Sequence, residues 1–257
     1  MGRIPKDAIT QLLSSVSGLF GVYIEDMDSG EVFEMNADHV FPSASVIKVP
    51  MLALLLKDVQ TGRLDWNKPI PLAAENRVGG TGILCELDPD YTPTLAVLAK
   101  LMIVVSDNTA TNQIMDLIGI DRFNAFCHEM GYEHITLMRK MLDFEAIRQG
   151  KNNYMCAGEA GRLLSSIARG EFVNSEVCGT IISIMEKQQC RNKLPALLPA
   201  VPSWSPAEER HNLKPGSLLV ANKTGELNRL QHDVGIFTLP DKRRYVISIF
   251  SGELLSD

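Results

Sequence analysis

Alternating apolar and polar positions predict strands near both ends of the chain. Close to the N-terminus the pattern covers 19–25 and 31–35, on either side of the turn sequence Asp28-Ser29-Gly30, and predicts a β-hairpin. Towards the C-terminus it predicts three strands, at 217–223, 232–238 and 244–250. Short connections between them favour antiparallel pairing.

Between these strands, apolar residues recur every three or four positions, which is typical of amphipathic helices. A shorter helix of the same kind is predicted at 6–16, and the proline-rich stretch 195–216 is predicted to be a loop. The helices expected in the middle of the chain cover 45–60, 94–105, 109–117, 121–130, 158–169 and 172–184.

The order of these elements predicts an α+β protein with two lobes. Strands from both ends of the chain would form one five-stranded antiparallel sheet with a flanking helix. We expect this sheet lobe to comprise 1–42 and 205–257, and the all-α lobe to comprise 43–204.

Composition narrows the classes of function. Of 257 residues, 45% are hydrophobic and 22% charged, which is ordinary for a globular protein, and the net charge is −6. A nucleic-acid-binding protein needs a dense basic face, and the nearest basic run is only Lys242-Arg243-Arg244. The sequence therefore predicts no nucleic-acid partner.

The cysteines and apolar runs bear on cofactors and location. Five cysteines are an odd number, and none has C-x-x-C spacing, so neither a zinc site nor a disulfide framework is expected. No apolar run approaches the ~20 residues of a membrane span. We predict no metal, no cofactor and no membrane association. The location predicted is cytoplasmic, or secreted if a leader has been removed.

Ser45 and Lys48 form the first candidate chemical motif. Ser45 opens a predicted helix, and a residue three positions on shares its face, with Cβ atoms about 5–6 Å apart. A lysine amine there can serve as a base if burial or a neighbouring cation lowers its pKa. An isolated S-x-x-K is weak evidence, because a serine cap followed by a surface lysine gives the same letters.

Two further motifs follow. Ser106-Asp107-Asn108 lies between two apolar helices, where it either caps the second helix or points polar groups into a cleft. Lys223-Thr224-Gly225 is predicted at the end of a strand, where glycine lets a ligand or another backbone approach closely. The glycines of GGTG, residues 79–82, are predicted to be a mobile segment that lines the site.

Together the three motifs, in this order, resemble the signature of class A β-lactamases and penicillin-binding proteins. The likeness extends over nearly the whole chain and is carried by FPSASVIKV at 41–49, SDNTATNQ at 106–113 and VANKTG at 220–225. It implies a class A β-lactamase-like fold and a serine hydrolase that forms an acyl-enzyme.

The resemblance also implies residue roles. Ser45 would be the nucleophile, Lys48 its base or part of its proton relay, and Ser106 the donor of a proton to the leaving nitrogen. Asn108 would hold the substrate amide. The remaining roles are carboxylate binding by Lys223 and Thr224, beside Gly225, and an oxyanion hole formed by the backbone N–H groups of Ser45 and Glu226.

One departure from the family concerns the water that hydrolyses the acyl-enzyme. The family holds it with a glutamate and, four residues later, an asparagine, on a loop that here spans 136–153 and looks about two residues short. Alignment from Thr136 puts Leu142 and Ala146 at those two positions. Asp143 and Glu145 are the nearby carboxylates; either substitutes for the missing glutamate, or both are solvated loop residues.

Other departures lie near the C-terminus. Glu226 shares a strand face with Thr224, so we expect its negative charge to weaken binding of carboxylate-bearing substrates. Arg229 is out of register with the arginine that often follows Lys-Thr-Gly in the family. The chain stops after its last strand, so the family's C-terminal helix is expected to be missing.

These observations predict β-lactam hydrolysis through Ser45, with slow deacylation. The alternatives are an esterase or D-alanyl peptidase on a non-antibiotic substrate, and a β-lactam sensor that stays acylated. The expected partner is a small amide or ester, and the expected oligomeric state is a monomer or weak homodimer.

Overall fold

The computed structural model describes residues 3–202 and 204–255, and the chain forms two compact units. The sheet unit comprises Met1–Val46 and Met155–Asp257, and the helical unit comprises Ile47–Tyr154. This division differs from the predicted one, because residues 155–204 belong with the sheet and not with the helices.

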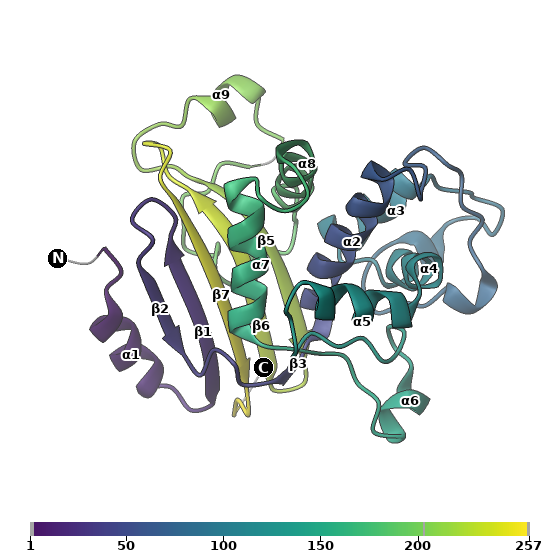
Figure 1. Cartoon of the computed structure of the whole chain (residues 1–257), viewed down its shortest axis with the longest axis horizontal. Helices are drawn as coiled ribbons and strands as arrows, with labels where there is room; N and C mark the ends of the chain where they lie inside the picture. Colours follow the sequence, from purple (N-terminus) through teal and green to yellow (C-terminus); the bar gives the residue numbers. More distant parts are fainter. Residues whose placement is uncertain (1–2, 203, 256–257) are drawn as a thin grey trace. The chain divides into compact units, whose positions relative to one another are not determined.

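The sheet unit is built on five antiparallel strands in the order β2-β1-β7-β6-β5. The N-terminal strand β1 pairs along its whole length with β7 from the C-terminus, which lies beside it in Figure 1. The predicted α+β fold with one five-stranded sheet from both chain ends is therefore confirmed. The strands are β1 (Leu19–Asp26), β2 (Val32–Met35), β5 (Leu219–Leu227), β6 (Leu230–Thr238) and β7 (Arg244–Gly252).

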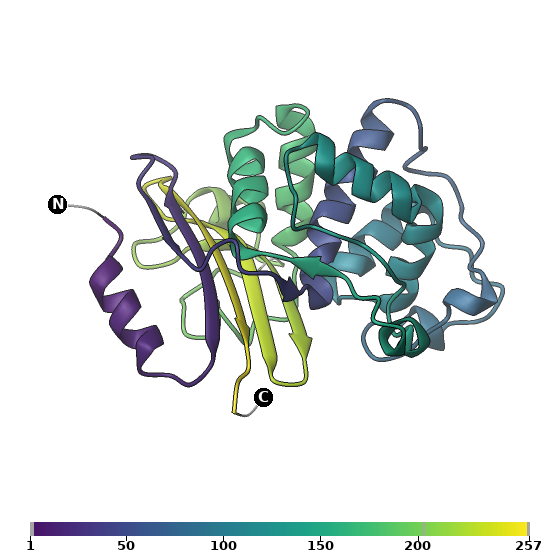
Figure 2. The ribbon, with the colours of Figure 1, turned by 60° about the horizontal axis from the view of Figure 1, so that its bottom comes forward.

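Helices cover both faces of this sheet (Figure 2). On one face, α1 (Lys6–Ser14) packs Ile9 and Leu13 on β1. On the other face, α7 (Ala157–Arg169) crosses β1 and β7, and α8 (Ser175–Met185) packs beside it. Gly161 permits this contact, because a Cβ there would lie 2.1 Å from the Tyr23 ring.

Strand β5 is longer than the alternation predicted. It runs through Lys223-Thr224-Gly225-Glu226 to Leu227, and β6 begins at Leu230. The prediction that the Lys-Thr-Gly motif ends its strand is therefore wrong. Two residues form the turn, and Arg229 takes a left-handed backbone conformation with φ of 58°. The motif thus has a fixed cross-strand register with β6.

The helical unit surrounds α2 (Lys48–Gln60). Its stretch from Val49 to Leu56 is apolar on all sides and fully buried, because α3, α4 and α5 each pack against it. A 3-10 turn, Ala44–Ile47, leads into α2. The other helices of this unit are α3 (Leu95–Val104), α4 (Asn108–Ile118), α5 (Ile120–Glu129) and the short α6 (Phe144–Arg148).

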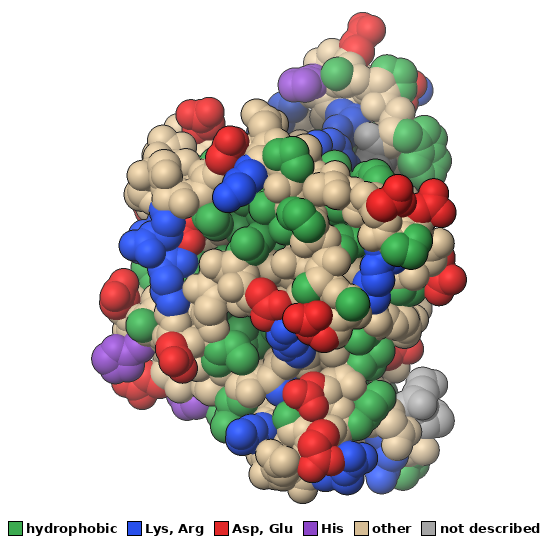
Figure 3. Space-filling model, turned by 90° about the vertical axis from the view of Figure 1, so that its right-hand side faces the viewer, with side chains coloured by type: hydrophobic (Ala, Val, Ile, Leu, Met, Phe, Trp, Pro, Cys, Tyr) green, Lys and Arg blue, Asp and Glu red, His purple; other side chains and the backbone are tan. Residues whose placement is uncertain are grey.

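Shorter elements complete the chain. They are β3 (Phe41–Pro42), β4 (Tyr154–Met155), the five-residue α9 (Ala207–His211) inside the expected loop, and the 3-10 turns Ala74–Asn76 and Leu84–Glu86. Within the described residues, the helices are all too short or too polar to cross a membrane. On the face shown in Figure 3, basic side chains are interspersed with acidic ones, so the positive charges there are locally balanced.

Candidate active site

The amine of Lys48 is the centre of a buried polar cluster in the helical unit. Its Nζ donates hydrogen bonds to the backbone oxygen of Ser106 at 2.8 Å and to the Ser106 Oγ at 3.0 Å. A third bond reaches the Oδ1 of Asn108 at 3.0 Å. Lys48 is fully buried, and Ser106 and Asn108 nearly so. We call these three residues the amine cluster; a Ser106 hydroxyl that faces an amine can pass a proton in either direction.

Ser45 lies three residues before Lys48 in the chain. It lies in the 3-10 turn Ala44–Ile47, and Lys48 is the first residue of α2. Residues three apart in such a turn present their side chains on one face. Ala44, directly before Ser45, has φ of 45°, a conformation that costs energy in any residue with a Cβ. Ser45 itself is only half-buried, which suits a nucleophile.

The motif Ser106-Asp107-Asn108 both contacts the lysine amine and caps a helix. Ser106 has φ of 55°, in the left-handed region. Asp107 caps α4, because its Oδ1 accepts the N–H of Ala110 at 2.8 Å. Capping, one of the two alternatives that the sequence leaves open, is therefore the role of Asp107, while Ser106 and Asn108 contact the lysine amine.

The GGTG segment, residues 79–82, contacts the amine cluster. Thr81 donates its hydroxyl to the backbone oxygen of Ser106 at 2.7 Å and accepts the Asn108 N–H at 3.1 Å. The Asn108 Nδ2 donates to the Gly79 oxygen at 3.0 Å. The amide of Asn108 is thus oriented from both ends, with its oxygen on Lys48.

Lys223 and Thr224 lie on β5 in the sheet unit. Lys223 is fully buried, and its Nζ donates to the Thr224 oxygen at 2.7 Å. Burial lowers the pKa of Lys223 to about 8, although the nearby Cys190 and Asp233 act in the opposite direction. Lys223 is therefore a cation whose charge titrates close to neutral pH.

Gly225 brings β5 against the segment that carries Ser45. A Cβ at Gly225 would lie 3.0 Å from Val46 Cγ2 and 3.2 Å from the Ser43 oxygen. A side chain at this position would crowd these atoms, so glycine favours the close approach that the sequence predicts. The residue that follows, Glu226, places its backbone on the same strand edge.

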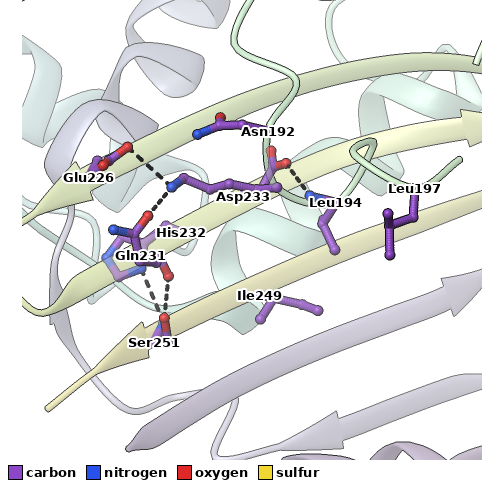
Figure 4. Close-up of a pocket in the computed structure, with 10 residues that line it drawn as sticks. Asn192, Leu194, Leu197, Glu226, Gln231, His232, Asp233, Ile249 and Ser251 are labelled. Atoms are coloured by element: carbon purple, nitrogen blue, oxygen red, sulfur yellow. Dashed lines mark hydrogen bonds and ion pairs between the residues drawn. The ribbon is translucent and has the colours of Figure 1, made fainter. Parts of the chain in front are cut away.

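The side chain of Glu226 is paired. It accepts a hydrogen bond at 3.1 Å from the amine of Lys193, which also donates to Gln231 (Figure 4). In the sheet register, Gln231 lies opposite Glu226, and Asp233 lies opposite Thr224. The two carboxylates thus share a sheet face with Thr224, as alternation predicts.

Among the described residues, the two candidate carboxylates of the 136–153 loop, Asp143 and Glu145, make hydrogen bonds and ion pairs only within the loop. Asp143 caps α6 by accepting the Ala146 N–H at 2.9 Å. The carboxylate of Glu145 is 62% exposed and paired with Arg148. The hypothesis that one of them replaces the missing glutamate finds no support in these contacts.

Leu142, in contrast, reaches the surroundings of the amine cluster. A Cβ at Gly80 would lie 3.1 Å from both Leu142 Cδ1 and Asn108 Nδ2. Leu142 also has φ of 60°, which is rare for a large side chain. The position aligned with the family glutamate therefore borders the cluster but carries an apolar side chain.

Two features of this region were not apparent from the sequence: the ion pair of Lys193 with Glu226, and the hydrogen bonds of the buried Asp233. Asp233 accepts the backbone N–H of Leu194 and the side-chain amide of Asn222, both at 3.0 Å. Burial raises the pKa of Asp233 to about 6, against the effect of these bonds. His232 is buried, with its Nε2 2.9 Å from the Pro42 oxygen, and burial lowers its pKa to about 4.

Comparison with known proteins identifies the family. A model described as the β-lactamase enzyme family matches residues 4–256. The chain belongs to this family. The crystal structure of a β-lactamase from Sphaerobacter thermophilus DSM 20745 has a TM-score of 0.83 and 27% identity, and covers 97% of this chain and 88% of that one. The predicted class A β-lactamase-like fold is thus confirmed.

Two other relatives add detail. The β-lactamase SME-1 of Serratia marcescens is 28% identical over 66% of this chain, which spans 58% of SME-1. The structure of PBP-A has a TM-score of 0.83 and 27% identity, over 98% of this chain and 88% of PBP-A. A Leu-to-Glu variant of PBP-A is described as an acyl-enzyme complex with penicillin G. The prediction of a β-lactamase-like serine hydrolase is confirmed at family level.

Proposed function

We propose that this hydrolase is acylated at Ser45 by β-lactams and releases the acyl group slowly. The observation that carries the proposal is the amine cluster, in which Lys48 contacts Ser106 and Asn108 one turn after Ser45. Lys48 would take the Ser45 proton, and Ser106 would pass it to the leaving nitrogen.

The remaining proposed roles belong to β5. Lys223 and Thr224 would bind the substrate carboxylate. The close approach at Gly225 supports an oxyanion hole made by the backbone N–H groups of Ser45 and Glu226. Neither Asp143 nor Glu145 is assigned a catalytic role, because one caps a helix and the other faces solvent.

Slow release of the acyl group is proposed because Leu142 stands at the position aligned with the family glutamate. Hydrolysis of an acyl-enzyme needs a base within hydrogen-bond reach of the attacking water. The side chain at the aligned position cannot accept a proton, although it borders Asn108 through Gly80. We therefore propose that acylation is efficient and that deacylation limits turnover.

Leu142 also favours a second candidate function, a penicillin-binding D-alanyl peptidase. Such an enzyme reacts with a peptide amide and is trapped by a β-lactam, and the likeness to PBP-A supports it. Release of D-alanine from a peptide that ends in D-alanyl-D-alanine separates it from a β-lactamase, which leaves the peptide intact.

The test is a burst experiment with a fluorogenic cephalosporin, followed by intact-mass measurement. We expect about one product per enzyme in the burst, a mass adduct on Ser45 and slow steady release. The Ser45→Ala variant is the control and should show neither burst nor adduct. Steady turnover without a burst would contradict slow deacylation, and the absence of any adduct would remove β-lactams as substrates.

A further inference from the structure

A pocket opens on the sheet face that carries Glu226. It has a volume of about 790 Å³, and Figure 4 shows Glu226, Gln231 and Asp233 on its polar side and Leu194, Leu197 and Ile249 on its apolar side. The amine of Lys193 stands at the polar side, between Glu226 and Gln231. We call Lys193, Glu226 and Gln231 the charged rim.

The two charged residues of the rim, Lys193 and Glu226, differ in exposure and in number of hydrogen bonds. The Lys193 side chain is 15% exposed and bonded to both Gln231 and Glu226. The Glu226 side chain is 59% exposed, and its ion pair is a single 3.1 Å contact. An exposed ion pair of this kind contributes little stability and is exchangeable. Lys193 is therefore the fixed member, and Glu226 the displaceable one.

Asp233 explains why Lys193 stays in place. Its carboxylate binds the N–H of Leu194, the next residue along the chain, and the amide of Asn222 on β5. The segment that carries Lys193 is thereby attached to β5 and β6 through a buried acceptor. The rim amine is held on the same strands as Thr224.

The register places the rim one step from Thr224. Glu226 and Thr224 are two residues apart on one strand face, which separates them by about 7 Å. Gln231 and Asp233 stand opposite them on β6. A substrate carboxylate bound at Thr224 would thus lie within the field of both rim charges.

We propose that Glu226 is an internal competitor for the substrate carboxylate. Its carboxylate pairs with the ammonium of Lys193, which is then not available to a substrate carboxylate bound near Thr224. A substrate without that carboxylate is therefore disfavoured less. This inference rests on the proposed acylation of Ser45. It makes Lys193 and Glu226 specificity-determining residues, which lower the advantage that a substrate gains from the carboxylate bound at Lys223 and Thr224.

The test compares benzylpenicillin with its methyl ester, which differ only in the carboxylate. The second-order rate of Ser45 acylation is measured for each by intact mass. We expect Glu226→Gln to raise the rate for benzylpenicillin roughly three- to tenfold and to change the rate for the ester less than twofold. In Glu226→Gln/Lys193→Met, the gain should disappear, because the freed ammonium is gone.

Controls separate the rim from general charge effects. Glu208→Gln removes an exposed carboxylate on α9 of the same unit and should leave both rates unchanged. Equal changes for benzylpenicillin and ester in Glu226→Gln, or a gain that persists without Lys193, would overturn the inference alone. Acylation of the wild-type chain by neither compound would overturn the proposed function and this inference with it.

Discussion

The amine cluster and the 136–153 loop, both in the helical unit, are built very differently. In the cluster, a buried amine meets a hydroxyl and an amide at 3.0 Å, and the amide is oriented from both ends. In the loop, one carboxylate caps a helix and the other faces solvent, and Leu142, like Asn108, lies beside Gly80. The difference teaches that the motif residues converge on one buried amine, whereas the loop carboxylates make local contacts.

Removing the nucleophile tests the whole comparison and has the largest expected effect. Ser45→Ala should abolish acylation by any β-lactam, because no other hydroxyl takes its position in the turn before α2. The fold should persist, since a change at this half-buried position costs about 1 kcal/mol or less. Intact mass after exposure to a β-lactam, with thermal unfolding as the control, checks this. An adduct formed at the wild-type rate would end the assignment.

Lys48→Ala tests the acylation side. The rate of adduct formation should fall by about 10²–10⁴-fold, the usual contribution of general base catalysis. Stopped-flow measurement of the burst gives the rate. Lys68→Ala, which removes an exposed lysine of the same unit, is the matched control and should react normally. A loss of less than about threefold would exclude Lys48 from proton transfer.

Leu142→Glu tests the hydrolysis side. A carboxylate at this position should accept a proton from water, so we expect deacylation to accelerate by about 10- to 100-fold while acylation changes little. The decay of the mass adduct measures it. Leu142→Gln has nearly the same size but no base and should stay slow; equal acceleration by both variants would show that loss of the leucine, not a base, matters.

The pH dependence of carboxylate recognition has a smaller expected effect. Lys223 must carry its charge to bind a carboxylate, and its pKa of about 8 means that it loses its proton above that pH. The rate with benzylpenicillin should fall relative to the methyl ester by about fivefold between pH 8 and pH 9, because the protonated fraction of Lys223 drops from about one half to about one tenth. A constant ratio up to pH 10 would show that Lys223 does not recognise the carboxylate.

Asp143→Asn and Glu145→Gln should have the smallest effect. Asparagine is as good a helix cap as aspartate, and Glu145 faces solvent, so deacylation should change less than about twofold. Adduct lifetime measures this for both variants. Accumulation of adduct in either one would place a catalytic carboxylate on the loop after all.

The sequence predicted those features that depend on local spacing. The sheet followed from alternation, and the pairing of Lys48 with Ser106 and Asn108 agrees with the three motifs in order. Lys193 was missed because it lies in a segment with no periodic pattern, where nothing in the sequence indicates its partner. Residues 155–204 were placed with the wrong unit because the apolar face of α7 fits a sheet or a helix equally well.

The hydrogen bonds of Asp107 link two segments of the helical unit, and this link bears on their local unfolding. One of its oxygens accepts the N–H of Ala110, and the other accepts the N–H groups of Ile83 at 2.7 Å and Leu84 at 2.9 Å. The start of α4 and the chain after GGTG are thus joined through one buried carboxylate. Their amide hydrogens should exchange with solvent together, as a single cooperative unit, and with one common opening free energy.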